Sequence, residues 1–66
     1  MNLLETFHHE LAAKLGDGTF ELTGETYLGR YQRGTVEVPL IDIQIADDVG
    51  GMPYLVSWAA NAAVKP

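Results

Sequence analysis

The chain is 66 residues long, 47% of its residues are apolar, and it contains no cysteine. A chain of this length forms one small domain, and without cysteine it has neither disulfides nor thiolate zinc sites. Its net charge of −5 at pH 7 argues against broad binding to nucleic-acid backbones, which depends on basic contacts.

The N-terminal segment predicts a helix over about residues 2–15. An apolar residue recurs every four positions and forms a stripe on one side: Leu3, Phe7, Leu11 and Leu15. Asn2 and Glu5 have the spacing of a capping box at the start of the helix. Gly16 supplies a left-handed stop at its end.

The period of the apolar residues then changes to two, which predicts strands over about residues 19–23 and 26–32. Gly24 and Glu25 separate the two strands. Gly29 interrupts the second strand, which is typical of a bulge or of a close backbone approach. Arg33 and Gly34 form the turn into the next strand.

A third strand is predicted over about residues 35–45, and its apolar alternation changes phase at Pro39. Before the proline, Val36 and Val38 occupy even positions. After it the apolar positions are odd: Ile41, Ile43 and Ile45. A one-residue slip moves the apolar set to the other face of a strand, and proline marks an edge, a start or a bulge. We therefore expect a bulge or bend near Pro39.

The remaining segments are predicted as a loop over residues 46–53, a strand over 54–58 and a tail over 59–66 that is either helical or frayed. Tyr54, Val56 and Trp58 alternate along the strand. The sequence thus predicts a single α+β domain over residues 1–66, with one N-terminal helix packed on a three- to four-stranded antiparallel β-meander. One helix covers one face of such a sheet, so the other face is polar or is covered by something else.

The usual constellations of catalysis and metal binding are missing from the sequence. His8 and His9 are adjacent, so on a helix they point about 100° apart and cannot share a metal. Ser57 is the only serine and lacks a nucleophile elbow. We predict no enzyme activity, no cofactor and no metal. With neither a signal peptide nor a membrane span, the chain is expected to be a soluble cytoplasmic protein.

Tyr27, Arg30, Tyr31 and Arg33 form the only cluster of basic and aromatic residues. The strand pattern places Arg30 on the face opposite the tyrosines. Three interpretations remain open: tyrosines at the margin of the core, a protein interface, or stacking on unpaired bases. The negative net charge makes direct nucleic-acid binding the least favoured of the three.

These features favour a small acidic protein-binding module that occupies the surface of a protein partner, as an inhibitor or an adaptor. Small proteins encoded by phages or other mobile elements share this profile, and the acids would suit the basic groove of a nucleic-acid-handling host protein. The expected partner-binding residues are Tyr27, Arg30, Tyr31, Arg33, Ile41, Ile43, Ile45, Asp47, Asp48 and Trp58.

Two alternative functions stay open. The first is a self-assembling structural subunit, a homodimer or larger homo-oligomer, because a core this small gains stability from assembly. The second is a single-stranded nucleic-acid binder that uses Tyr27, Arg30, Tyr31 and Arg33.

Overall fold

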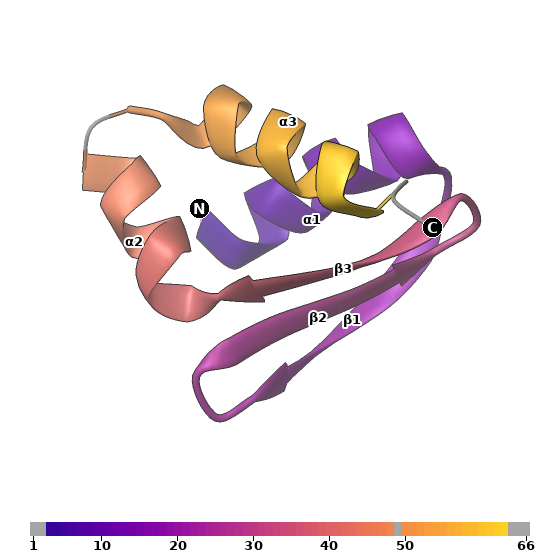
Figure 1. Cartoon of the computed structure of the whole chain (residues 1–66), viewed down its shortest axis with the longest axis horizontal. Helices are drawn as coiled ribbons and strands as arrows, with labels where there is room; N and C mark the ends of the chain where they lie inside the picture. Colours follow the sequence, from indigo (N-terminus) through magenta and orange to yellow (C-terminus); the bar gives the residue numbers. More distant parts are fainter. Residues whose placement is uncertain (1–2, 49, 64–66) are drawn as a thin grey trace.

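The computed structural model describes residues 3–48 and 50–63, and in this part of the chain it shows three helices and a three-stranded antiparallel sheet (Figure 1). The elements in chain order are α1 (Leu3–Leu15), β1 (Gly18–Thr23), β2 (Thr26–Tyr31), β3 (Gly34–Pro39), α2 (Leu40–Asp48) and α3 (Met52–Ala63). The α+β class and the meander order β1-β2-β3 are confirmed. The two helices after the sheet are not in the sequence-based prediction.

Helix α1 agrees with the prediction over the described residues. Its apolar stripe is buried at Phe7, Leu11 and Leu15. Gly16 ends the helix with a φ of +85°, which is the left-handed conformation expected of it. The carbonyl of Leu15 then accepts a hydrogen bond from the Arg33 backbone N–H at 2.9 Å, which ties the end of α1 to the turn between β2 and β3. The predicted cap, Asn2, lies outside the described residues.

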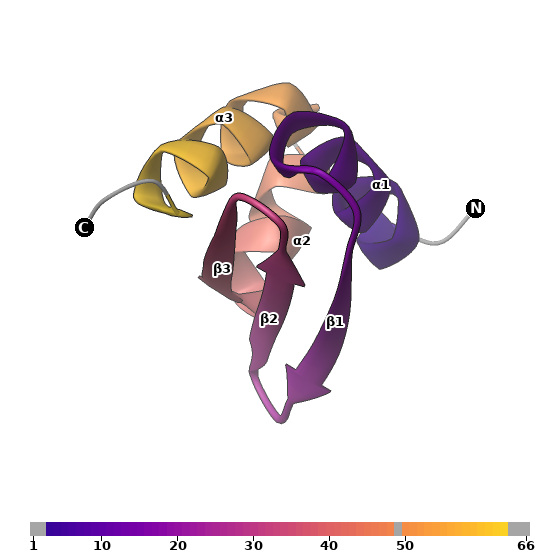
Figure 2. The same cartoon turned by 90° about the vertical axis from the view of Figure 1, so that its right-hand side faces the viewer.

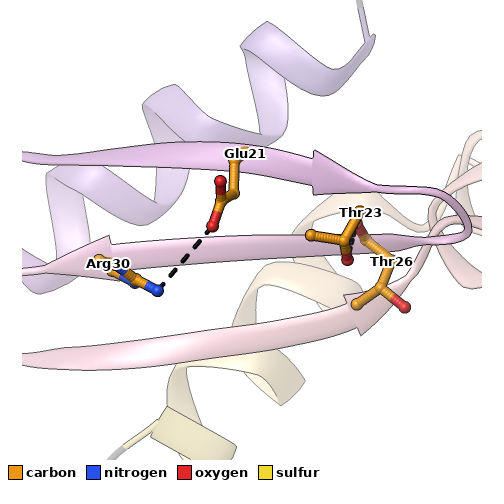
Figure 3. A network of polar contacts seen from close by, with 4 residues as sticks. All are labelled: Glu21, Thr23, Thr26 and Arg30. Atoms are coloured by element: carbon orange, nitrogen blue, oxygen red, sulfur yellow. Dashed lines mark hydrogen bonds and ion pairs between the residues drawn. The ribbon is translucent and has the colours of Figure 1, made fainter.

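The sheet has one face toward the helices and one face without a covering element in the described chain. Helices α1 and α3 lie against each other on the same side of the sheet, as the two views in Figures 1 and 2 show. The inward face carries Tyr27, Val36 and Val38, which are fully buried or nearly so. The outward face is polar. On it the Nη2 atom of Arg30 lies 3.8 Å from the Oε1 atom of Glu21 (Figure 3). A second layer on that face is therefore not required.

The predicted strand over residues 35–45 is wrong beyond Pro39, where the chain changes from strand to helix. Pro39 is the last residue of β3 and pairs with Thr26 at the edge of the sheet, where a missing N–H is tolerated. The next residue, Leu40, begins α2, and its backbone N–H bonds to the Glu25 carbonyl at 2.7 Å. The phase change thus marks a boundary between two kinds of element.

The predicted strand over residues 54–58 is also wrong, because this segment lies inside α3. Gly51 accepts the first hydrogen bond of the helix, from the Leu55 N–H at 3.0 Å. Pro53 sits in the first turn, where a helix needs no donor from it. The helix continues to Ala63, so most of the predicted tail over residues 59–66 is helical.

The predicted loop over residues 46–53 shrinks to the few residues between α2 and α3. Gly50 has a φ of +66°, and its N–H bonds to the Asp47 carbonyl at 3.1 Å. The N–H of Gly51 bonds to the Ala46 carbonyl, which completes a Schellman ending of the helix. The chain reverses there, so α2 and α3 are neighbours in space.

The core joins all three helices to the inward face of the sheet. Its largest fully buried side chains are Tyr27, Phe7, Leu11, Ile43, Val36, Val38 and Val56. None of the helices in the described residues is both long enough and apolar enough to span a bilayer.

Candidate functional site

A cavity of about 370 Å³ lies between α2 and α3. We call it the α2–α3 groove, and its lining residues are Asp42, Ile45, Ala46, Gly51, Tyr54, Leu55 and Trp58. The Schellman ending of α2 fixes the approach of the two helices at one end of the groove. The lining is mostly aliphatic and aromatic, with a single carboxylate among side chains of the described chain.

Helix α2, which forms one wall of the groove, carries isoleucines that do not belong to the core. One side of α2 points toward the core and carries residues spaced three apart, Leu40, Ile43 and Ala46. Ile43 and Ala46 are buried. Ile41 and Ile45 lie one turn apart on another side of the helix and stay 58% and 54% exposed. Because the side chains of Ile41 and Ile45 lie in water, they do not hold α2 on the core.

The α3 wall presents an aromatic pair with the same spacing. Tyr54 and Trp58 are 76% and 42% exposed, whereas Leu55, Val56 and Ala59 of the same helix are buried. Burial of those three side chains anchors α3 on the core, so the two rings remain free for contacts outside it. Tyr54 was not among the predicted partner-binding residues, because its pairing with Trp58 becomes visible only once residues 52–63 are taken as helical.

Most of the exposed large apolar side chains that the structure describes lie around this groove. Five large apolar side chains are exposed in the described residues: Leu22, Ile41, Ile45, Tyr54 and Trp58. Three of them line the groove, and Ile41 lies one turn from Ile45 on α2. Only Leu22, near the tip of the β1–β2 hairpin, belongs to another region.

The charged side chains of α2 and α3 that the structure describes all have one sign. Helix α2 carries Asp42 in its first turn and Asp47 and Asp48 in its last turn, and the described residues of α2 and α3 include no basic side chain. Asp42 is half-buried, and its carboxylate makes no hydrogen bond or ion pair with a residue that the structure describes. The groove therefore combines an apolar floor with an unpaired carboxylate.

A second polar cluster, formed by His8, Tyr27 and Tyr31, lies between α1 and the sheet. The His8 Nδ1 is 2.7 Å from the Tyr31 hydroxyl and 3.2 Å from the Tyr27 hydroxyl, and the two hydroxyls are hydrogen-bonded to each other. The Tyr27 ring stacks on Phe20 and meets the edge of Phe7, with centroid distances of 5.0 Å in both pairs. Fully buried and enclosed by rings, Tyr27 has a structural role.

The tyrosine hydroxyls of this cluster stay protonated at neutral pH. Burial raises the pKa of Tyr27, and its hydrogen bond and charge interaction with Tyr31 raise it further. Burial also raises the pKa of Tyr31, partly offset by the hydrogen bond from Tyr27. Neither phenol is poised to act as a base.

The structure does not bring the predicted basic-aromatic cluster together on one surface. Tyr27 is buried and Tyr31 half-buried on the inward face. Arg30 lies on the outward face with Glu21, and the Arg33 guanidinium donates a hydrogen bond to the Lys14 carbonyl.

The other predicted partner-binding residues divide between core and surface. Ile43 is buried in the core. Ile41, Ile45, Asp47, Asp48 and Trp58 are exposed on α2 and α3.

Comparisons of this chain with protein-family models, with curated proteins and with solved structures found no match. Its function is therefore inferred from the groove and the residues around it.

Proposed function

We propose that this protein is a small protein-binding module that acts by occupying a partner's surface, as an inhibitor or an adaptor, and that the α2–α3 groove is its contact surface. The observation that carries the proposal is the clustering of exposed apolar side chains. Four of the five in the described chain lie on α2 and α3. Contiguous exposed apolar surface on a small protein marks an interaction site, whereas scattered single residues need no explanation.

The side chains of the groove suit a protein contact better than a structural role. Tyr and Trp dominate the energy of protein interfaces, where they fill desolvated pockets. Here Tyr54 and Trp58 stand beside Ile45 in a groove whose helices already have separate anchors in the core. The lining residues extend over positions 42–46 of α2 and 54–58 of α3, so each wall is about 7.5 Å long, which matches between one and two turns of a partner helix.

The charge of the groove favours a different protein over a second copy of this chain. Self-docking through this face would bring the carboxylates of two α2 helices together, and like charges across an interface cost several kcal/mol. The described residues of α2 and α3 offer no basic side chain to compensate. The alternative of a self-assembling subunit is therefore less well supported at this surface.

The test compares what three forms of the protein retain from extracts of the cell that produces it. Ile45→Asp places a charge in the groove, and Leu22→Asp places the same charge on the hairpin, at a side chain of similar exposure. We expect the wild type and Leu22→Asp to retain the same partner and Ile45→Asp to lose it. Circular dichroism and thermal melting verify that both variants fold. Identical capture by all three forms, or loss with Leu22→Asp alone, would contradict the proposal.

A further inference from the structure

The single carboxylate in the α2–α3 groove restricts what can be buried there. Asp42 shares the cavity with Ile45, Tyr54, Leu55 and Trp58. Its carboxylate has no hydrogen-bonding or ionic partner among the described residues. A partner that covered the groove with apolar atoms alone would strip water from this carboxylate without replacing its hydrogen bonds, which is strongly unfavourable.

A cation is the group that meets both parts of this cavity. A guanidinium or ammonium forms charge-assisted hydrogen bonds with a carboxylate. Its charge is also attracted to the faces of Trp and Tyr rings. The methylene stem of Arg or Lys packs along aliphatic walls such as Ile45 and Leu55. A purely apolar side chain suits the apolar walls but leaves the carboxylate without a partner. An acidic side chain suits neither part.

We propose that the partner inserts an arginine or lysine side chain, carried by an apolar segment, into the α2–α3 groove against Asp42 and the rings of Tyr54 and Trp58. This inference rests on the proposed function and names the chemistry of the partner. Asp47 and Asp48, exposed at the end of the same helix, add negative potential that steers a basic segment toward the groove.

A second copy of the chain does not present such a side chain from its own groove. Arg30 is paired with Glu21 on the outward face of the sheet, and Arg33 donates to the Lys14 carbonyl at the end of α1. A contact of one copy's groove with these residues of another copy would join two different surfaces of the chain. A head-to-tail contact of this kind forms open chains unless they close into a ring.

The test is a double-mutant cycle with a defined peptide probe. The probe is a fluorescein-labelled helical peptide of about 15 alanines and leucines with one central arginine, a length at which isolated helices become stable. Its matched partner carries citrulline, which keeps the shape of arginine and lacks the charge. Both are titrated by fluorescence anisotropy against the wild type, Asp42→Asn and Asp47→Asn. Asp47→Asn is the control, because it removes one charge from the same helix outside the cavity lining.

We expect citrulline to weaken binding to the wild type and to Asp47→Asn about tenfold, and binding to Asp42→Asn less than about twofold. Equal affinity for both peptides, the same loss with Asp42→Asn as with the wild type, or no binding at millimolar peptide would overturn the inference. If capture of a partner still depends on Ile45 but the cycle shows no coupling, this inference fails and the proposed function stands. Loss of groove-dependent capture refutes the proposed function itself.

Discussion

Gly29→Ala should destabilise the protein because two tyrosine rings cover this position. A Cβ added there would lie 2.5 Å from the Tyr31 Cε2, 2.8 Å from the Tyr31 hydroxyl and 2.9 Å from the Tyr27 Cε1. Both rings would have to move. Tyr27 has no space to do so, since it is fully buried between Phe7 and Phe20.

The expected cost of Gly29→Ala follows from three contributions. Forcing an extra carbon into a packed core costs about 1–3 kcal/mol. Displacing the Tyr31 ring also weakens its hydroxyl hydrogen bonds to Tyr27 and His8, at about 1 kcal/mol each. Alanine restricts the unfolded chain more than glycine does, and this stabilises the folded protein by about 0.4–1 kcal/mol. A net loss of about 3 kcal/mol should lower the Tm by roughly 12–24 °C in a domain of this size.

Urea unfolding followed by circular dichroism measures this loss, and a second variant isolates its cause. Tyr31→Leu removes the ring that lies nearest the added carbon. In that background Gly29→Ala should cost less than it does in the wild type, because the closest clash is gone and only the contact with Tyr27 remains. A Gly29→Ala variant as stable as the wild type, or one whose cost is unchanged by Tyr31→Leu, would refute this account of the packing.

Two further predictions concern pH and the division between core and groove. The free energy of unfolding should fall as the pH rises above 10.0, because the phenols of the unfolded chain then ionise. In the folded protein the raised pKa values of Tyr27 and Tyr31 keep these two phenols protonated. Urea titrations at several pH values should show a smaller fall for Tyr31→Phe than for the wild type. Phe7→Ala should lower the free energy of unfolding by about 3–5 kcal/mol and leave little folded protein, because Phe7 is fully buried. Tyr54→Ala should change it by less than about 0.5 kcal/mol, because Tyr54 is exposed. Similar losses for both variants in thermal melts would mean that the groove belongs to the core.

The parts of the fold that can be predicted from the sequence have one clear period. The stripe of α1 recurs every four residues, and the strands β1 and β2 alternate every two. At Gly29 the sequence predicts a bulge or a close backbone approach, whereas the atoms that come close are those of the Tyr27 and Tyr31 rings.

The segment after Pro39 was misassigned because two patterns overlap in it. Ile41, Ile43 and Ile45 alternate as a strand would, yet the helix buries Ile43 together with Ala46 and leaves the other two isoleucines in water. Alanine carries a weak apolar signal beside isoleucine, so the spacing of three was hidden. Choosing between the patterns takes tertiary contacts that local sequence does not contain.

The candidate site was predicted in part, for a related reason. Ile41, Ile45 and Trp58 were expected at an interface, and all three are exposed on α2 and α3. Tyr54 and Asp42 were missed, because only the packing of two helices side by side makes them line one cavity with Trp58.

The most direct test of the central claim is site-specific photo-crosslinking in the cell that produces the protein. The photoreactive residue benzoylphenylalanine replaces either Tyr54, in the groove, or Thr35, on the outward face of the sheet. The account predicts a crosslink to one protein partner from position 54, lost when Ile45→Asp is added, and none from position 35. Crosslinking from position 35 alone, or from neither position, would contradict it.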